Sequence, residues 1–191
     1  MSKATRESLF TVAYVVVGLI AAIIVGYLTL QKRLFHFPLP MLPFLAVGLT
    51  GALVYALVQM RRAGLAILMI LLLFLMQAAM VPPIRPASLA AAAMFAIPVG
   101  FALLGGAYAQ KSLARLKVGR FIVMGIIVAA GYGVMMLLWL IRSHTDVRMD
   151  LVFRQALVGL ELGAAMGLGF ELVDLVGPRR KPKLAAARPP K

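Results

Sequence analysis

Six long apolar runs, separated by short polar connections, constrain this chain more than any other feature of its sequence. They occupy residues 9–30, 41–60, 63–81, 87–109, 121–141 and 151–176. An apolar run of roughly 18 residues or more can cross the hydrocarbon core of a bilayer as a helix. None of the runs alternates apolar with polar residues, as the strands of a membrane barrel would. We therefore predict an all-α integral membrane protein, a compact bundle of six transmembrane helices.

The composition agrees with a membrane chain that has no separate soluble domain. Apolar residues make up 63% of the 191 residues, and the mean hydropathy is +0.98, whereas soluble globular domains are about 45–50% apolar. We predict one transmembrane domain over residues 1–177 and a basic, disordered cytoplasmic tail over residues 178–191. The first run lacks the small-residue cleavage pattern of a signal peptide, so we expect it to remain as the first span.

Lysine and arginine are distributed unequally between alternate connections, and this asymmetry predicts the orientation of the bundle. The side with both termini and the connections after the second and fourth runs has 14 of these residues, and the other side has 5. Because cytoplasmic loops are enriched in lysine and arginine, we predict that both termini are cytoplasmic and that the protein lies in the cell (inner) membrane. Cytoplasmic loops that face anionic lipid headgroups explain the excess of basic residues and the net charge of +14. We therefore expect no nucleic-acid partner.

Small residues recur at four-residue spacing in four of the six runs. Such spacing lets two helix backbones approach closely, and close packing holds helices together in lipid. The predicted packing residues are Gly18, Ala22 and Gly26; Gly48, Ala52 and Ala56; Gly125, Ala129 and Gly133; and Gly159, Gly163 and Gly167. These faces either pack within one bundle or leave one face for another subunit. The Leu/Met-rich third run has almost no small residues of this kind, and we predict that it lies at the edge of the bundle.

Pro98 lies inside the fourth run and removes one backbone hydrogen bond from the predicted helix. Gly100, Gly105 and Gly106 follow it. The fourth span is therefore expected to be the most deformable one, with Pro98 as a candidate hinge.

The sixth run carries charged residues at depths where a charge is costly. Glu161 lies ten residues after the start of the run, about 15 Å deep by helical rise and so close to the bilayer midplane. Arg154 is seven residues earlier and shares a helix face with Glu161, which makes the pair a candidate intramembrane polar site. Glu161 is either a neutral acid hydrogen-bonded to a tyrosine or glutamine of another span, or part of a proton, ion or substrate site.

The other acids of the sixth run have simpler interpretations. Asp150 precedes Arg154 by four residues, a spacing that favours an ion pair at the start of the helix. Glu171 and Asp174 lie in the last turns. Because charged side chains near a helix end reach the interface at little cost, we predict that both are solvated anchors.

The sequence contains no motif that indicates catalysis or a cofactor. There is no cysteine, no H-E-x-x-H and no G-x-S-x-G. His36 and His144 fall at the predicted outer ends of spans, where interfacial histidines are a simpler interpretation than ligands of a haem. We therefore expect neither enzymatic activity nor a bound cofactor or metal.

Two functions remain compatible with these features. The first is a non-catalytic polytopic subunit that packs against, or assembles, a larger membrane complex through its small-residue faces and its third span. The second is a small-solute or ion permease, or the solute-binding subunit of a transporter, that uses Arg154 and Glu161. Polar side chains within the spans are sparse, which favours the subunit.

Overall fold

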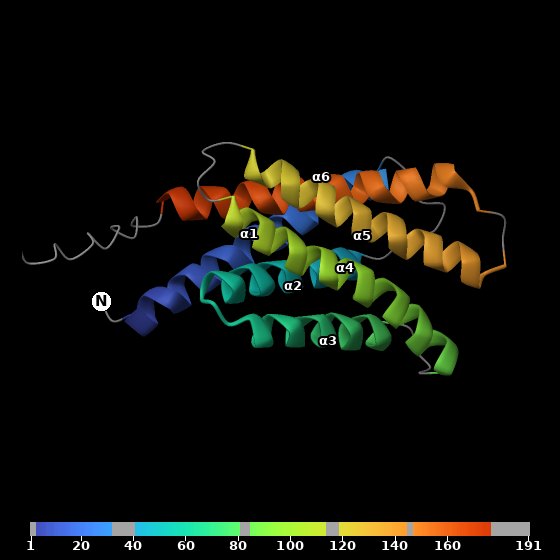
Figure 1. The fold of residues 1–191 in the computed structure, drawn as a ribbon, viewed down its shortest axis with the longest axis horizontal. Coiled ribbons are helices and arrows are strands. Elements are labelled where there is room, and N and C mark those ends of the chain that lie inside the picture. The colour runs from blue at the N-terminus through green and yellow to red at the C-terminus, as the bar shows by residue number, and fades with distance from the viewer. Residues whose placement is uncertain (1–2, 32–40, 81–84, 114–118, 145–146, 177–191) are drawn as a thin grey trace, which may run out of the picture.

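The computed structural model describes residues 3–31, 41–80, 85–113, 119–144 and 147–176 (Figure 1). These residues form six helices and no strand, so the predicted all-α fold is confirmed. The helices are α1 (Lys3–Gln31), α2 (Met41–Gln59), α3 (Ala63–Ala79), α4 (Pro86–Ser112), α5 (Arg120–Arg142) and α6 (Met149–Val176). The predicted tail, residues 178–191, lies outside the described residues.

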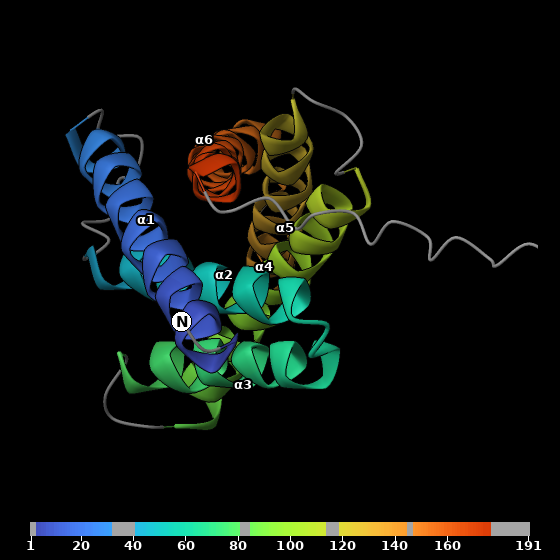
Figure 2. The same cartoon turned by 90° about the vertical axis from the view of Figure 1, so that its left-hand side faces the viewer.

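Consecutive helices run in opposite directions along the long axis of the bundle and pack side by side (Figure 1). Each helix contacts the next one in sequence, α1 closes against α6, and α2 also contacts α4. One end of the bundle therefore gathers the ends of α2, α4 and α6 with the beginnings of α1, α3 and α5; this end faces the viewer in Figure 2. We call it the basic end, because Arg61, Arg62, Lys111 and Arg120 lie there.

Five of the six helices are long and apolar enough to cross a membrane, namely α1, α2, α4, α5 and α6. The fold is therefore that of a multi-pass membrane protein. The remaining helix, α3, has 17 residues and reaches only about 25 Å, against a hydrocarbon core of about 30 Å. The prediction that residues 63–81 lie at the edge of the bundle agrees with the contacts of α3, which among the described helices touches α2 and α4 alone.

The connection between α2 and α3 is a three-residue turn, Met60 to Arg62. Arg61 adopts a φ of 61° there, in the left-handed region that a tight reversal requires. Gly119, with a φ of 90°, precedes α5 in the same region, where glycine carries no steric penalty. The tight turn at Arg61 brings α3 back alongside α2.

Small residues lie where the helix backbones come closest. A Cβ added to Gly18 would be 2.6 Å from the carbonyl oxygen of Gly48, and one added to Gly163 would be 3.0 Å from the Cα of Gly125. Such contacts leave no room for a side chain, so they fix the α1–α2 and α5–α6 distances. The partners of the other predicted packing glycines are also in this chain: Phe44 for Gly26, Ala156 for Gly133, Ala129 for Gly159 and Phe121 for Gly167. Ala22 meets Gly48 in the same way.

The fourth helix continues through Pro98 without interruption. The carbonyl group of Pro98 packs against Gly131 of α5, where an added Cβ would be 2.9 Å from the oxygen. The role of Pro98 as a hinge stays a prediction.

Candidate functional site

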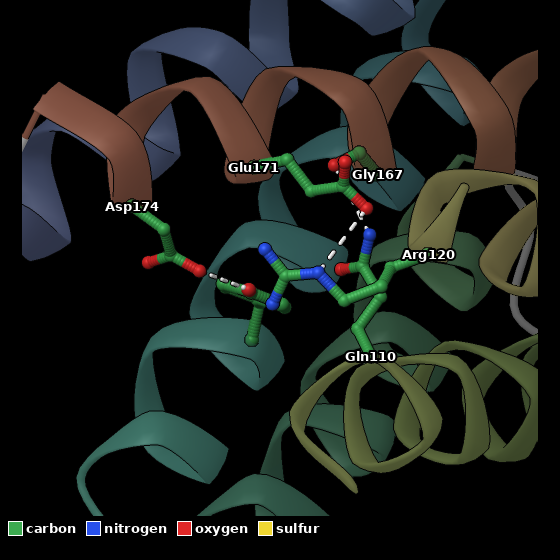
Figure 3. A network of polar contacts seen from close by, with 6 residues as sticks. Gln110, Arg120, Gly167, Glu171 and Asp174 are labelled. Carbon is green, nitrogen blue, oxygen red and sulfur yellow. Dashed lines mark hydrogen bonds and ion pairs between the residues drawn. The ribbon is translucent and has the colours of Figure 1, made fainter. Parts of the chain in front are cut away.

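Two acids in the last turns of α6, Glu171 and Asp174, lie on the face of the helix that is turned toward the bundle (Figure 3). Glu171 is 8% exposed, and Asp174 is half-buried. The prediction that they are solvated anchors is therefore wrong. Other helices supply hydrogen-bond donors and a positive charge at this depth, so neither acid has to reach water.

The carboxylate of Asp174 accepts hydrogen bonds from two tyrosines on different helices. The Tyr14 hydroxyl of α1 donates to Oδ1 at 2.5 Å, and the Tyr55 hydroxyl of α2 donates to Oδ2 at 2.7 Å. Both tyrosine rings also pack against Phe170, Tyr55 in a stacked arrangement at 4.5 Å and Tyr14 edge-on at 5.7 Å. Asp174 thus joins α1, α2 and α6 through charge-assisted hydrogen bonds inside an aromatic cluster.

Glu171 lies beside Arg120, the first residue of α5 (Figure 3). The distance from Arg120 Nε to Glu171 Oε1 is 3.6 Å, which makes an ion pair but is too long for a hydrogen bond. The two side chains are only 13% and 10% exposed. Because water screens such a pair poorly, its electrostatic attraction is stronger than that of a surface pair.

Gln110 of α4 completes this polar cluster. Its side chain is fully buried, and its Nε2 donates a hydrogen bond of 3.1 Å to the carbonyl oxygen of Gly167 on α6 (Figure 3). The nearby Lys111 donates from Nζ to the carbonyl oxygen of Val58, in the last turn of α2. The same carbonyl oxygen accepts the backbone N–H of Arg61 at 3.1 Å, so the lysine adds a second, charged donor at the end of the helix.

The polar cluster, which we define as Tyr14, Tyr55, Gln110, Arg120, Glu171 and Asp174, therefore links five helices at the basic end. Three of its buried atoms have no hydrogen-bond partner within the described part of the chain: Gln110 Oε1, Arg120 Nε and Glu171 Oε1. Across that same part, no group of three or more histidine, aspartate or glutamate side chains could hold a metal ion. What the cluster does chemically is to hold helix ends together by hydrogen bonds and charge.

The two residues of the predicted intramembrane site occupy different environments on α6. Arg154 is exposed, and Glu161 is half-buried. Neither ion pair found between described residues joins them. Both residues lie away from the polar cluster, nearer the beginning of α6.

The ion pair at the beginning of α6 joins Asp150 to Arg148 rather than to Arg154. Arg148 Nη2 lies 2.9 Å from Asp150 Oδ2, and Arg148 Nε lies 3.3 Å from Oδ1. The predicted partner is corrected because Arg148 presents two N–H groups to the two carboxylate oxygens at once. Both side chains are exposed, so this pair contributes little to stability.

His144 and three further tyrosines, Tyr27, Tyr108 and Tyr132, lie in different environments within the described part of the chain. His36 lies outside the described residues, and His144 is exposed just after α5. Tyr132 is buried and packs edge-on against Phe95 at 6.1 Å. Tyr27 and Tyr108 are 55% and 41% exposed.

The spacing of the glycines in α6 indicates the direction in which the two buried acids point. Glu171 follows Gly167 by four residues and so continues the spacing of Gly159 and Gly163. Asp174 follows Gly167 by seven residues, which turns it only about 20° from the direction of that glycine. Both acids therefore belong to the packing face of α6, whereas Glu161 does not.

No known protein family matches this chain, and no curated protein or solved structure matches it either.

Proposed function

We propose that this chain is a non-catalytic, polytopic subunit of a larger membrane complex, and that a different membrane-spanning chain packs against the outward face of α3. The glycines of α1, α5 and α6 pack against other helices of the same chain. These glycine faces therefore leave no close-packing surface for a partner. A partner is expected on a different surface, and this supports the choice of α3. The polar cluster is likewise engaged inside the bundle.

The outward face of α3 is the observation that carries the proposal. Five of its large apolar side chains are between 43% and 54% exposed: Leu65, Ile67, Leu68, Leu71 and Leu75. At 17 residues the helix is also the shortest of the six. A short apolar helix fits a bilayer of normal thickness poorly, and association with another chain is one way to relieve that mismatch.

The test is purification in a mild detergent, followed by a count of the chains that remain at fixed stoichiometry. We expect the wild-type protein to retain a second polypeptide and the variant Leu71→Ala/Leu75→Ala to lose it. The matched control is Ile122→Ala/Ile126→Ala on α5, where the two side chains are 50% and 57% exposed at the same four-residue spacing. Purification of the wild type alone, or equal loss in both variants, would contradict the proposal.

We also propose that the bundle has six spans, with α3 crossing the membrane, and that both termini face the cytoplasm of a cell whose inner membrane holds the protein. The excess of lysine and arginine at the basic end supports this orientation. The chain has no cysteine, so single cysteines placed at Ser2, Ser112 and Ser143 report cleanly. In intact cells a membrane-impermeant maleimide should label the Ser143 variant only, and labelling at Ser2 would reverse the orientation.

A further inference from the structure

An open apolar groove lies between α1 and α6 at the basic end. It has a volume of about 450 Å³, and its walls come from residues 9–17 of α1 and residues 169–176 of α6. Leu9, Leu172 and Val176 on its walls are 61%, 54% and 88% exposed. The groove therefore opens to the outside of the bundle, and its volume lies within the range of ligand-binding pockets.

Small residues shape the groove, and a polar contact holds its walls together. A Cβ added to Gly169 would be 2.1 Å from Cγ1 of Val17, so this glycine lets α1 and α6 meet at the inner end of the groove. Ala13 contributes only a methyl group to the wall. The Tyr14 to Asp174 hydrogen bond joins the same two helices beside the groove. The space is thus a built feature of the α1–α6 contact.

The depth of the groove in the membrane limits what fills it. Both walls belong to helices that can span a bilayer. Residues 9 and 17, the two ends of the α1 wall, are eight helical steps apart and so about 12 Å apart, which is a little less than half of a hydrocarbon core of about 30 Å. An apolar groove of that length, within one leaflet and open to lipid, matches the shape and polarity of an acyl chain.

Basic residues come before and after the walls of the groove in the sequence. Lys3 and Arg6 lie in the first turns of α1, just before the wall begins, and Arg179, Arg180, Lys181 and Lys183 follow Val176 in the sequence. We propose that the groove binds an acyl chain of an anionic glycerophospholipid, with the headgroup at the level of Lys3 and Arg6. Each basic residue close to a membrane surface adds about 1 kcal/mol of attraction for negative charge.

The first test counts the lipids that the purified full-length protein retains, by native mass spectrometry. The protein is reconstituted in vesicles of phosphatidylglycerol or of phosphatidylcholine with identical acyl chains, and is then extracted in a mild detergent. We expect retention of phosphatidylglycerol in the wild type and its loss in Ala13→Phe, which fills the groove. The matched control is Ala130→Phe on the exposed face of α5, which should retain the lipid.

The headgroup has its own test, in which the groove stays open. Lys3→Gln/Arg6→Gln should reduce the preference for phosphatidylglycerol over phosphatidylcholine by roughly fivefold for each charge removed. Equal retention of the two lipids by the wild type would overturn the anionic part of the proposal.

A photoreactive phosphatidylglycerol, with the reactive group on its acyl chain, gives a result that does not depend on the folding of any variant. In the wild-type protein the label should concentrate on residues 9–17 and 169–176. Uniform labelling of all helices, or protection of these residues by a polypeptide, would overturn the proposal. Retention of the lipid in Ala13→Phe at the wild-type level would do the same.

Discussion

Replacement of Tyr14 and Tyr55 by phenylalanine tests whether Asp174 links three helices. Each substitution removes one hydroxyl and keeps the ring, so the stacked and edge-on contacts with Phe170 remain. The two hydroxyls bind different oxygens of the carboxylate. Either single variant therefore leaves Asp174 with one tyrosine donor, and only the double variant removes both.

The expected loss follows from burial and from the strength of hydrogen bonds in membranes. Tyr55 is 0% exposed and Tyr14 is 5% exposed, so water does not easily replace either hydroxyl. Hydrogen bonds between membrane helices average about 0.6 kcal/mol and reach about 1.7 kcal/mol, and those to a charged group are the stronger ones. We expect each single variant to lower the free energy of unfolding by about 1 kcal/mol. The double variant should lose about 3 kcal/mol, more than the sum, because the carboxylate is then left without either donor.

The free energy of unfolding is measured in mixed micelles by titration with a denaturing detergent, with helix content followed by circular dichroism. The control is Tyr108→Phe, whose side chain is 41% exposed on α4; it should change stability by less than about 0.5 kcal/mol. If Tyr14→Phe and Tyr55→Phe behave like this control, or if their effects simply add, Asp174 does not link the helices in the way that we describe.

Three further predictions concern the ion pair of Arg120, the packing of Gly163 and the role of Glu161. Arg120→Gln should cost about 3 kcal/mol because it leaves Glu171 buried without its charge partner, and Arg120→Gln/Glu171→Gln should recover most of that loss in the same unfolding assay. Gly163→Ala should cost about 1–3 kcal/mol by overpacking, since its Cβ would lie 2.8 Å from Cβ of Val128, whereas Gly64→Ala, with no atom within 4 Å, should not destabilise the protein. Glu161→Gln should fold normally, with no ion or solute flux in liposomes for either form; wild-type flux that this change abolishes would favour the permease.

Much of the fold was predictable because apolar length and turn chemistry are local properties. The ends of the six helices lie within six residues of the ends of the apolar runs that predict them. The composition of the third run predicts a helix over residues 63–81, whereas α3 ends at Ala79 and has 17 residues. Apolar residues continue into Val81, and only Pro82 and Pro83 mark where a helix cannot continue. Composition alone therefore overestimates the length of this helix.

The site was less predictable because the sequence shows how deep an acid lies but not what faces it. Judged by depth alone, Glu161 has a high free-energy cost of burial and Glu171 has a low one. Burial of Glu171 depends on Arg120, and the environment of Asp174 depends on Tyr14 and Tyr55, all from helices far away in the sequence. The spacing of the glycines predicts the direction of each acid on α6. It does not predict which hydrogen-bond donors and charges of other helices face the acids.

The position of the polar cluster at one end of the bundle has a physical reason. In lipid, apolar side chains gain little by leaving the hydrocarbon for a neighbouring helix, so the middle of the bundle depends on backbones that meet at glycine, as Gly18 and Gly48 do. Charged and hydroxyl groups hold helices more strongly, but their desolvation cost rises with depth. Glu171 and Asp174 lie in the last turns of α6, where the desolvation cost of a charge is lower than in the middle of a span. The side chains of Arg120 and Glu171 are nevertheless only 13% and 10% exposed, so water screens their attraction poorly. The glycine contacts hold neighbouring helices together where their backbones cross. The buried acids of α6 add hydrogen bonds and an ion pair that hold the helix ends together at the basic end.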